Sequence, residues 1–448
     1  MKNYLMSLGI LSAAFFIEGC KKDHSFTAPE APVGPEPMVI YKAPDTTNAV
    51  AGHYFVTFKE SFKMPFAKVY NGSKTIRGAK EAAAIAYNQQ ARTDMRAQLT
   101  NANGSMIVNI NDIDAFVSNV VVGFSAQLSA DAVKKLVANP NVQYVEYQNS
   151  EMTDADATET KLTTKAYSPQ AQIIDPLRTA VGFKNGWQRS QTVTIWIIDG
   201  GCDLDHPDLK VYTPWARSFS NDPTAEDRYG HGTKVAGVLA AIDNGFGTRG
   251  VAAGAYIVPI KITDTPRSSR TANFVKALDY IWSKCASSDV VNISQSFNVS
   301  STGVASMEAA IRSYSGYDIW FAIAAGNNSG FASQRSPARM GSPEYPYAET
   351  LGFIHTVSSH GAGYKFSSIF PGGGGSNYGA AIDCAAPGEN IYTTAMGGGY
   401  TDDVVQGTSF AAPIVAGILF MNNGVYYKKA TVTGDVDNYH EKVAFLNY

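Results

Sequence analysis

The stretch GTSFAAP, residues 407–413, opens an apolar run with the pattern of a helix. It places Ser409 in the first turn of that helix. Two other motifs precede it: IIDGG at 197–201 closes a hydrophobic strand, and GHGTKVAG at 230–237 opens a second helix. An Asp, a His and a Ser, each at the end of a regular element, are one way to activate a serine as a nucleophile.

The three residue types suit this chemistry for a physical reason. A serine hydroxyl is a poor nucleophile until a base takes its proton, and histidine is the side chain suited to that task near neutral pH. We therefore expect Ser409 to be the nucleophile, His231 the general base and then acid, and Asp199 the carboxylate that orients the imidazole. Asp199 emerges from a buried strand, where a charge needs a partner, and His231 is the available one.

Each motif alone is weak evidence. An Asp after a strand is most often a turn former, GTS is a common helix cap, and a single His is often a core residue. Together and in this order, however, they resemble the motifs of the subtilisin-like serine proteases, the subtilases. The resemblance implies a serine endopeptidase that hydrolyses peptide bonds through an acyl-enzyme.

The resemblance extends to substrate-binding segments. The sequence AAGN at 324–327 is similar to the family's oxyanion-hole motif, which implies that the Asn327 amide and the backbone N–H of Ser409 stabilise the oxyanion. VNIS at 291–294 resembles the edge segment that pairs with substrate backbone, and this implies substrate-binding roles for Ser294 and Ser296. The family's usual glycines are replaced here by QSF at 295–297, so the family's substrate preference cannot be carried over.

The family requires no cofactor, although calcium serves as a structural ion in some relatives. Asp383, in IDCAAPG at 382–388, resembles a position that helps to bind calcium in them. The carbonyl ligands of such a site cannot be read from sequence, so calcium stays an open expectation.

From about residue 173 onward, near-continuous apolar strands alternate with helices. This pattern predicts an α/β fold, a doubly wound and mostly parallel sheet with helices on both faces, as in subtilisin. The expected strands are 193–198, 257–262, 290–293, 319–324 and 353–357, and the expected helices are 231–242, 271–285, 304–314 and 409–421. Chemistry in such folds lies at the carboxyl ends of the strands, where Asp199 and Asn327 both fall.

Residues 51–150 predict a separate small α+β domain. Its expected order is β-α-β-α-β, with strands at 53–58, 115–124 and 142–147 and helices at 78–99 and 129–138. The domain resembles the inhibitory propeptide of subtilases, especially at 124–129 and 142–146, which implies an intramolecular inhibitor and folding aid. An unrelated small domain is the alternative. Residues 151–172 form a polar linker in which we expect the maturation cleavage, and 173–448 form the catalytic domain.

The first 20 residues predict an export signal. The apolar segment 4–17 is too short for a membrane span and fits a signal peptide. A small residue directly before Cys20 resembles a bacterial lipoprotein cleavage site, which implies a lipidated Cys20 and an anchor in the outer membrane or at the cell surface. A plain signal peptide with an incidental cysteine is the alternative. Residues 21–50 are rich in proline and form an expected tether.

Composition narrows the remaining possibilities. The chain has 448 residues with 45% hydrophobic and 17% charged content, as in globular proteins. A net charge of -3 and the lack of a basic stripe give no reason to expect a nucleic-acid partner. We expect a monomer that acts on peptides or proteins, with Cys202, Cys285 and Cys384 as small buried side chains.

Two other functions compete with the protease. An esterase of the α/β-hydrolase type fits poorly, because Ser409 lies in GTSFA and not in a G-x-S-x-G elbow. A catalytically silent surface binding module that keeps the fold is the second, since a fold alone does not prove activity.

Overall fold

The structure is a computed structural model that describes most of the chain beyond residue 48. The described residues are 49–59, 77–100, 104–149, 152–154, 164–165, 171–173, 181–182, 194–264, 271–298, 304–345, 348, 351–370, 373–402, 404–437 and 439–446. The predicted signal peptide with Cys20, and nearly all of the predicted tether, lie outside them.

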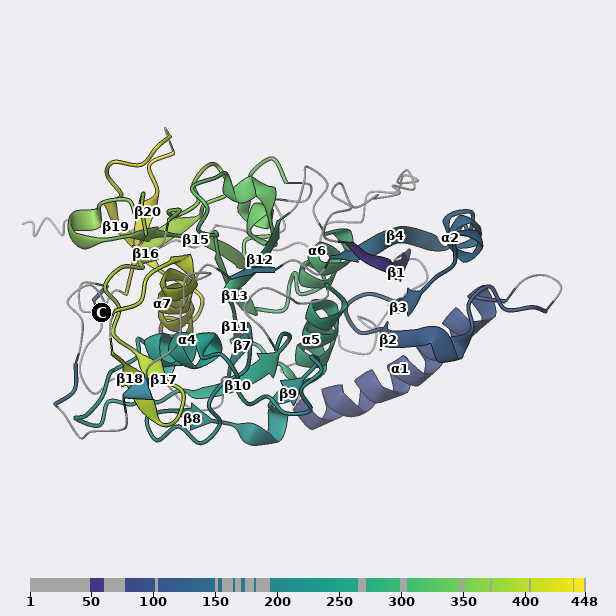
Figure 1. Ribbon diagram of the computed structural model, residues 1–448, viewed down its shortest axis with the longest axis horizontal. Coiled ribbons are helices and arrows are strands. Elements are labelled where there is room, and N and C mark those ends of the chain that lie inside the picture. Colours follow the sequence, from purple (N-terminus) through teal and green to yellow (C-terminus); the bar gives the residue numbers. More distant parts are fainter. Residues whose placement is uncertain are drawn as a thin grey trace, which may run out of the picture.

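A ten-stranded sheet forms the centre of the larger part of the molecule (Figure 1). Its strands are β7 (Ile195–Asp199), β8 (Lys210–Val211), β9 (Arg217–Ser218), β10 (Tyr256–Lys261), β11 (Val290–Ile293), β13 (Trp320–Ala324), β15 (Ile354–His360), β16 (Cys384–Pro387), β19 (Tyr427–Thr431) and β20 (Lys442–Phe445). They follow the order β19-β20-β16-β15-β13-β11-β7-β10-β8, and β9 also pairs with β10. Only β19 and β20 pair antiparallel in this sheet, so the predicted mostly parallel α/β sheet is confirmed.

Helices cover both faces of this sheet. They are α4 (His231–Ala240) and α7 (Thr408–Met421) on one face, and α5 (Thr271–Lys284) and α6 (Ala305–Arg312) on the other. Side chains alternate along a strand, so Ile195 and Ile197 of β7 pack with α4 and α7, whereas Trp196 and Ile198 pack with α5 and α6. Burial on both faces explains why these strands read as continuous apolar runs.

The strands and helices expected in this part all form, with ends that differ by a few residues. The sequence did not reveal β8, β9, β16, β19 and β20. β16 is a run of small residues, CAAP, without the β-branched side chains typical of strands. β19 carries two lysines and lies at the sheet edge, where charged side chains protect an exposed strand from further pairing.

A smaller antiparallel sheet precedes the large one in the chain. It consists of β1 (Ala49–Phe58), β2 (Ile113–Val117), β3 (Gly123–Gln127) and β4 (Val142–Asn149), in the order β2-β3-β1-β4, with helices α1 (Arg77–Gln98) and α2 (Ala130–Val137). The predicted single strand at 115–124 is wrong, since a turn at 118–122 divides it into β2 and β3. The element order is therefore β-α-β-β-α-β. Val120 and Val121 in this turn are apolar because they pack against the large part, and this hid the turn in the sequence.

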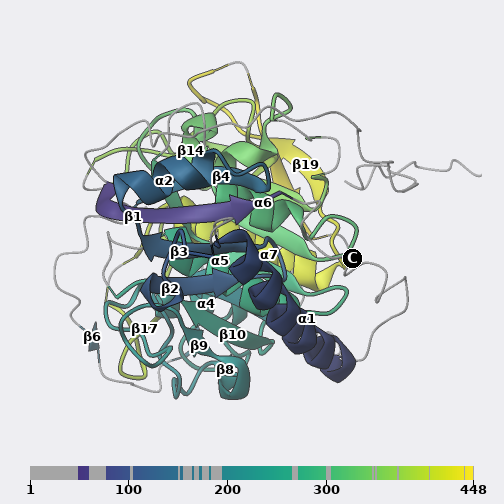
Figure 2. The same ribbon diagram turned by 90° about the vertical axis from the view of Figure 1, so that its right-hand side faces the viewer.

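The small sheet lies on α5 and α6, and α1 runs alongside α5 (Figure 2). Phe55, Ala115 and Val117 of the sheet belong to the same hydrophobic cluster as the inner residues of α5 and α6. The two parts therefore share one continuous apolar interface.

A carboxylate from each part fastens this interface. Asp279 of α5 accepts hydrogen bonds from the backbone N–H groups of Ser118, Asn119 and Val120 at 3.1, 2.5 and 3.1 Å. In the opposite direction, Glu146 of β4 accepts from the backbone N–H and the hydroxyl of Ser306 at the start of α6. Cys202, Cys285 and Cys384 are buried thiols, as expected. Within the described residues, no helix is both long and apolar enough to cross a membrane.

Candidate active site

Asp199 is the last residue of β7, and its side chain is buried. The backbone N–H of Gly200 donates to Asp199 Oδ1 at 2.7 Å, which fixes the carboxylate. A Cβ at Gly232, in the first turn of α4, would lie 2.0 Å from the Gly201 carbonyl oxygen. Only glycine therefore lets α4 approach the end of β7 this closely.

His231 is the first residue of α4 and faces Asp199. Its Nδ1 lies 2.9 Å from Asp199 Oδ1 and 3.0 Å from Oδ2, with both side chains buried. Asp227 holds the start of the helix by accepting from the Thr233 backbone N–H and hydroxyl at 2.9 and 2.7 Å. Gly230, with φ of 96°, turns the chain into the helix in a conformation that favours glycine.

Ser409 is the second residue of α7 and makes reciprocal hydrogen bonds with Ser294. Its Oγ donates to the Ser294 carbonyl, and the Ser294 Oγ donates to the Ser409 carbonyl, both at 2.9 Å. Pro413 explains the second bond. It lacks the N–H that would otherwise bond the carbonyl four residues earlier, so the Ser409 carbonyl can accept from Ser294.

Asn327 follows β13 and contacts the start of α7. Its Oδ1 accepts from the Thr408 backbone N–H at 2.9 Å and from the Thr408 hydroxyl at 2.8 Å. These two bonds orient the amide so that its donor group, Nδ2, is the end turned away from Thr408. The structure thus brings Asp199 to His231, Ser294 to Ser409, and Asn327 to the residue before Ser409.

Ser296 lies in a short strand that already has a partner. This strand, β12 (Gln295–Asn298), pairs with β14 (Arg335–Ser336) on one side and antiparallel with β5 (Met152–Asp154) on the other. In the second pairing Gln295 is opposite Asp154 and Ser296 is opposite Thr153. A segment from the predicted linker therefore occupies the edge where a substrate strand is expected.

Two residues of the site were not recognised in the sequence. Gln295 directs its side chain back toward Asp199, with Nε2 3.4 Å from Asp199 Oδ1 and 3.1 Å from the Tyr229 hydroxyl. The Tyr229 ring stacks near the His231 ring, with centroids 6.3 Å apart and planes at 17°. The replacement of the expected glycines at 295–297 was the available signal.

The carboxylate of Asp383 forms a hydrogen bond with the protein backbone. Its Oδ2 accepts from the backbone N–H of Thr356 at 2.9 Å. Within the described part of the chain, no group of three or more His, Cys, Asp and Glu side chains is arranged to hold a metal ion. The predicted calcium site at Asp383 therefore has no such group around it.

Oxygen atoms gather instead in the loop after α4. The Gln172 Nε2 lies 2.9, 3.5 and 3.0 Å from the carbonyl oxygens of Ile242, Phe246 and Thr248. Asn244, in the same loop, donates to the buried carboxylate of Asp208 at 2.8 Å. Burial raises the pKa of the Asp208 carboxyl to about 6. Carbonyl, amide and carboxylate oxygens are the donors that calcium prefers, so this loop fits the ion better than Asp383 does.

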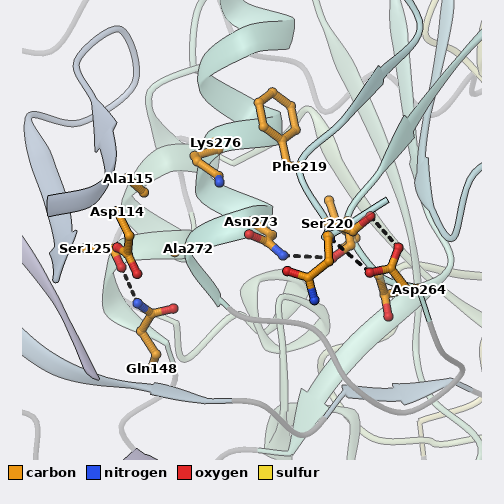
Figure 3. Close-up of a pocket in the computed structure, with 13 residues that line it drawn as sticks. Asp114, Ala115, Ser125, Gln148, Phe219, Ser220, Asp264, Ala272, Asn273 and Lys276 are labelled. Carbon is orange, nitrogen blue, oxygen red and sulfur yellow. Dashed lines mark hydrogen bonds between the residues drawn. The ribbon is translucent and has the colours of Figure 1, made fainter. Parts of the chain in front are cut away.

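A cavity of about 350 Å³ lies elsewhere, between the small sheet and the large part (Figure 3). Asp114 and Gln148 line it from the small sheet, and Asp264 and Lys276 line it from the large part. Asp199, His231 and Ser409 are not among its lining residues. This cavity is therefore separate from the candidate active site.

The family profile of the subtilases matches residues 190–425, more than half of the chain. This chain belongs to the subtilase family. Subtilisin NAT from Bacillus subtilis subsp. natto is 29% identical over 294 residues, which cover 65% of this chain and 68% of that protein. Subtilisin J from Geobacillus stearothermophilus is 30% identical over 295 residues, which again cover 65% of this chain and 68% of that protein.

A solved structure supports the fold of this subtilase. Fervidolysin from Fervidobacterium pennivorans matches with a TM-score of 0.54 at 19% identity, covering 85% of this chain and 56% of that one. The large part of the subtilase therefore has the subtilisin-like fold, and the chain is a serine endopeptidase of this class.

Proposed function

We propose that this subtilase cuts peptide bonds with Ser409 as nucleophile, His231 as general base and acid, and Asp199 as the orienting carboxylate. The observation that carries the proposal is the contact of His231 Nδ1 with both Asp199 oxygens, at 2.9 and 3.0 Å in a buried setting. Because Nδ1 faces the carboxylate, Nε2 is the ring nitrogen that takes and returns protons.

In the proposed reaction, the Ser409 hydroxyl leaves the Ser294 carbonyl, to which it donates at 2.9 Å, and turns toward His231. His231 Nε2 takes the Ser409 hydroxyl proton while Oγ forms a bond to the peptide carbonyl carbon. The tetrahedral intermediate then breaks its C–N bond, and His231 returns the proton to the departing amine. A water molecule, activated in the same way, hydrolyses the acyl-enzyme and releases the second product.

Asn327 and the backbone N–H of Ser409 supply the oxyanion hole in this proposal. We expect Asn327→Ala to lower kcat by roughly 10²–10³-fold with little change in KM, the magnitude known for the equivalent loss in a subtilisin. Steady-state kinetics on a chromogenic peptide amide measure this effect. Asn221→Ala, at an exposed loop position, is the matched control and should retain wild-type kcat. A kcat within about threefold of wild type in Asn327→Ala would remove the residue from the oxyanion hole.

We infer that residues 51–150 are an inhibitory propeptide. In support, β5 already pairs with β12, whose first residue follows Ser294, and Ser294 contacts Ser409. An antiparallel partner of β12 runs toward Ser294 as its own chain proceeds. The maturation cleavage is therefore expected just after Asp154, within the linker 151–172.

Intact mass of the chain expressed from Lys21 tests the processing. The wild type should lose its N-terminal part and begin a few residues after Asp154, whereas Ser409→Ala should stay whole. A mature N-terminus far from this position would show that β5 does not present the cleaved bond.

The propeptide interface is expected to weaken as pH rises. Burial raises the pKa of Glu146 to about 7 and that of Asp279 to about 6. The docked state then binds more protons than the separated parts do, so docking is strongest below about pH 4 and weakens as pH rises toward 7. In the Ser409→Ala background, Tm measured from pH 4 to 8 should fall, and adding Glu146→Gln should flatten part of the decline. If Tm fell with pH as steeply in that variant as without Glu146→Gln, Glu146 would not be a cause of the pH dependence.

We propose that a structural calcium ion binds the loop 242–248. The Asp208 carboxylate and the carbonyls of residues 242, 246 and 248 would hold it. The Gln172 and Asn244 amides, which now donate N–H to these oxygens, would turn so that their own oxygens face the ion. The ion would supply a positive charge that keeps the buried Asp208 carboxylate ionised.

With such a site, EGTA should lower the Tm of the wild type by several degrees, and Asp208→Asn should remove this response to EGTA. Asp383→Asn, the matched control, should keep it. A wild-type Tm that ignores EGTA would contradict the proposal.

We further propose that the chain is exported and anchored through a lipid on Cys20. The support is the sequence of the first 20 residues, with its short apolar segment and the small residue before the cysteine. The proline-rich tether would then hold the endopeptidase away from the membrane surface, where protein substrates can reach it.

A further inference from the structure

Gln295 contacts the two halves of the site at once. Its backbone pairs with Asp154 in the strand that occupies the substrate edge, and its side chain reaches Asp199 Oδ1 at 3.4 Å. The same Nε2 lies 3.1 Å from the Tyr229 hydroxyl. The Tyr229 ring stacks near His231, so one side chain links the substrate strand with both the carboxylate and the imidazole.

The burial of Gln295 is costly for the fold. The residue is only 1% exposed, and its Oε1 has no hydrogen-bond partner among the described residues. A buried acceptor without a partner destabilises the folded state. A hydrocarbon side chain of similar size would therefore fold at least as well here, and stability does not explain an amide at this position.

We propose that Gln295 is a positioning residue that sets the charge and orientation of Asp199 and, through it, the proton affinity of His231. The inference rests on the proposed function, because it assumes that His231 is the base. Nε2–H donates toward the carboxylate and draws part of its negative charge away from the imidazole. Without this donor, Asp199 stabilises the imidazolium more strongly and His231 keeps its proton to higher pH.

Other titratable groups near the pair are the same in every variant below. They are Cys202 after β7, Lys261 beside Asp199 on β10, and Asp227 and Tyr229 before α4. From α7, the nearby ring is that of Phe410, with its centroid 5.9 Å from that of His231. A change in the pH profile can therefore be assigned to position 295.

The test is the pH dependence of kcat/KM for the mature enzyme on a peptide amide. Gln295→Glu adds a negative charge beside Asp199. The low-pH side of the kcat/KM profile, its acidic limb, should therefore move to higher pH by roughly 1 pH unit. Gln295→Met removes the amide, donor and unpartnered acceptor together, without adding a charge. The acidic limb of its profile should therefore move in the same direction by a smaller amount, with Tm equal to or above that of the wild type. The control is Gln334→Glu, the same change at an exposed position, whose limb should not move.

Two results would overturn the inference. One is an acidic limb in Gln295→Met that coincides with wild type, and the other is a loss of Tm in Gln295→Met, which would indicate a structural role. Failure of the proposed function looks different, because Ser409→Ala would then remain active. If Ser409→Ala is inactive and the Gln295 variants keep the wild-type limb, only the role of Gln295 is wrong.

Discussion

Ser409→Ala is expected to lower kcat on a peptide amide by about 10⁶-fold, the magnitude known for loss of the nucleophile in a subtilisin. No neighbouring group replaces the Oγ that forms the acyl-enzyme. The substitution removes one buried oxygen and its hydrogen bond to the Ser294 carbonyl, while α7 keeps its first turn. The variant should therefore fold, with a Tm close to that of the unprocessed wild type.

The measurement needs an enzyme freed of its propeptide. Ser409→Ala can be trimmed by a small amount of active wild type, which is then removed by an affinity tag. Ser333→Ala, at an exposed position, serves as the control and should match wild type. If Ser409→Ala retained more than about one-hundredth of the wild-type kcat, another residue would have to be the nucleophile.

Asp199→Asn is expected to lower kcat by about 10⁴-fold, as the equivalent change does in a serine protease triad. The carboxylate now contacts His231 Nδ1 through both oxygens, which directs the N–H of the imidazole toward it. An amide of the same shape can donate to Nδ1, so it stabilises the tautomer in which Nε2 carries the proton. That ring cannot act as the base for Ser409.

Burst kinetics on an activated ester separate this effect from poor folding. Asp199→Asn should show slow acylation with a KM near that of the wild type, whereas a misfolded enzyme would show fewer active sites. The exposed Asp402→Asn is the matched control. A loss below about tenfold in Asp199→Asn would show that His231 does not depend on Asp199 for its tautomer.

The ends of the elements were predictable, because short-range chemistry determines them. Asp199 follows a strand that is apolar on both faces, and His231 follows a glycine that turns the chain. Pro413 acts locally as well, since a proline inside a helix leaves the carbonyl four residues earlier without its usual partner. That carbonyl belongs to Ser409, and Ser294 now bonds it.

Contacts between distant segments were not predictable. The pairing of β5 with β12 joins residues far apart in the chain, and nothing in either short segment specifies the register. The turn at 118–122 was hidden because its valines pack against another part of the chain. The inward direction of the Gln295 side chain likewise depends on Tyr229 and Asp199, which lie on other elements.

The oxygen-rich loop at 242–248 was likewise not predictable from the sequence. Three of its six proposed calcium ligands are backbone carbonyls, which every residue carries, so their convergence on Gln172 appears only in the fold. Asp383 is similar to a calcium ligand of relatives in sequence, yet its carboxylate bonds the Thr356 backbone.

The identity of the nucleophile is the central claim, and covalent labelling tests it most directly. The mature protein would be treated with a fluorophosphonate, digested, and mapped by mass spectrometry. The adduct is expected on Ser409 alone and should be absent from Ser409→Ala and strongly reduced in His231→Ala. An unlabelled mature protein, or an adduct on a different serine, would contradict the account and favour a silent binding module with a protease fold.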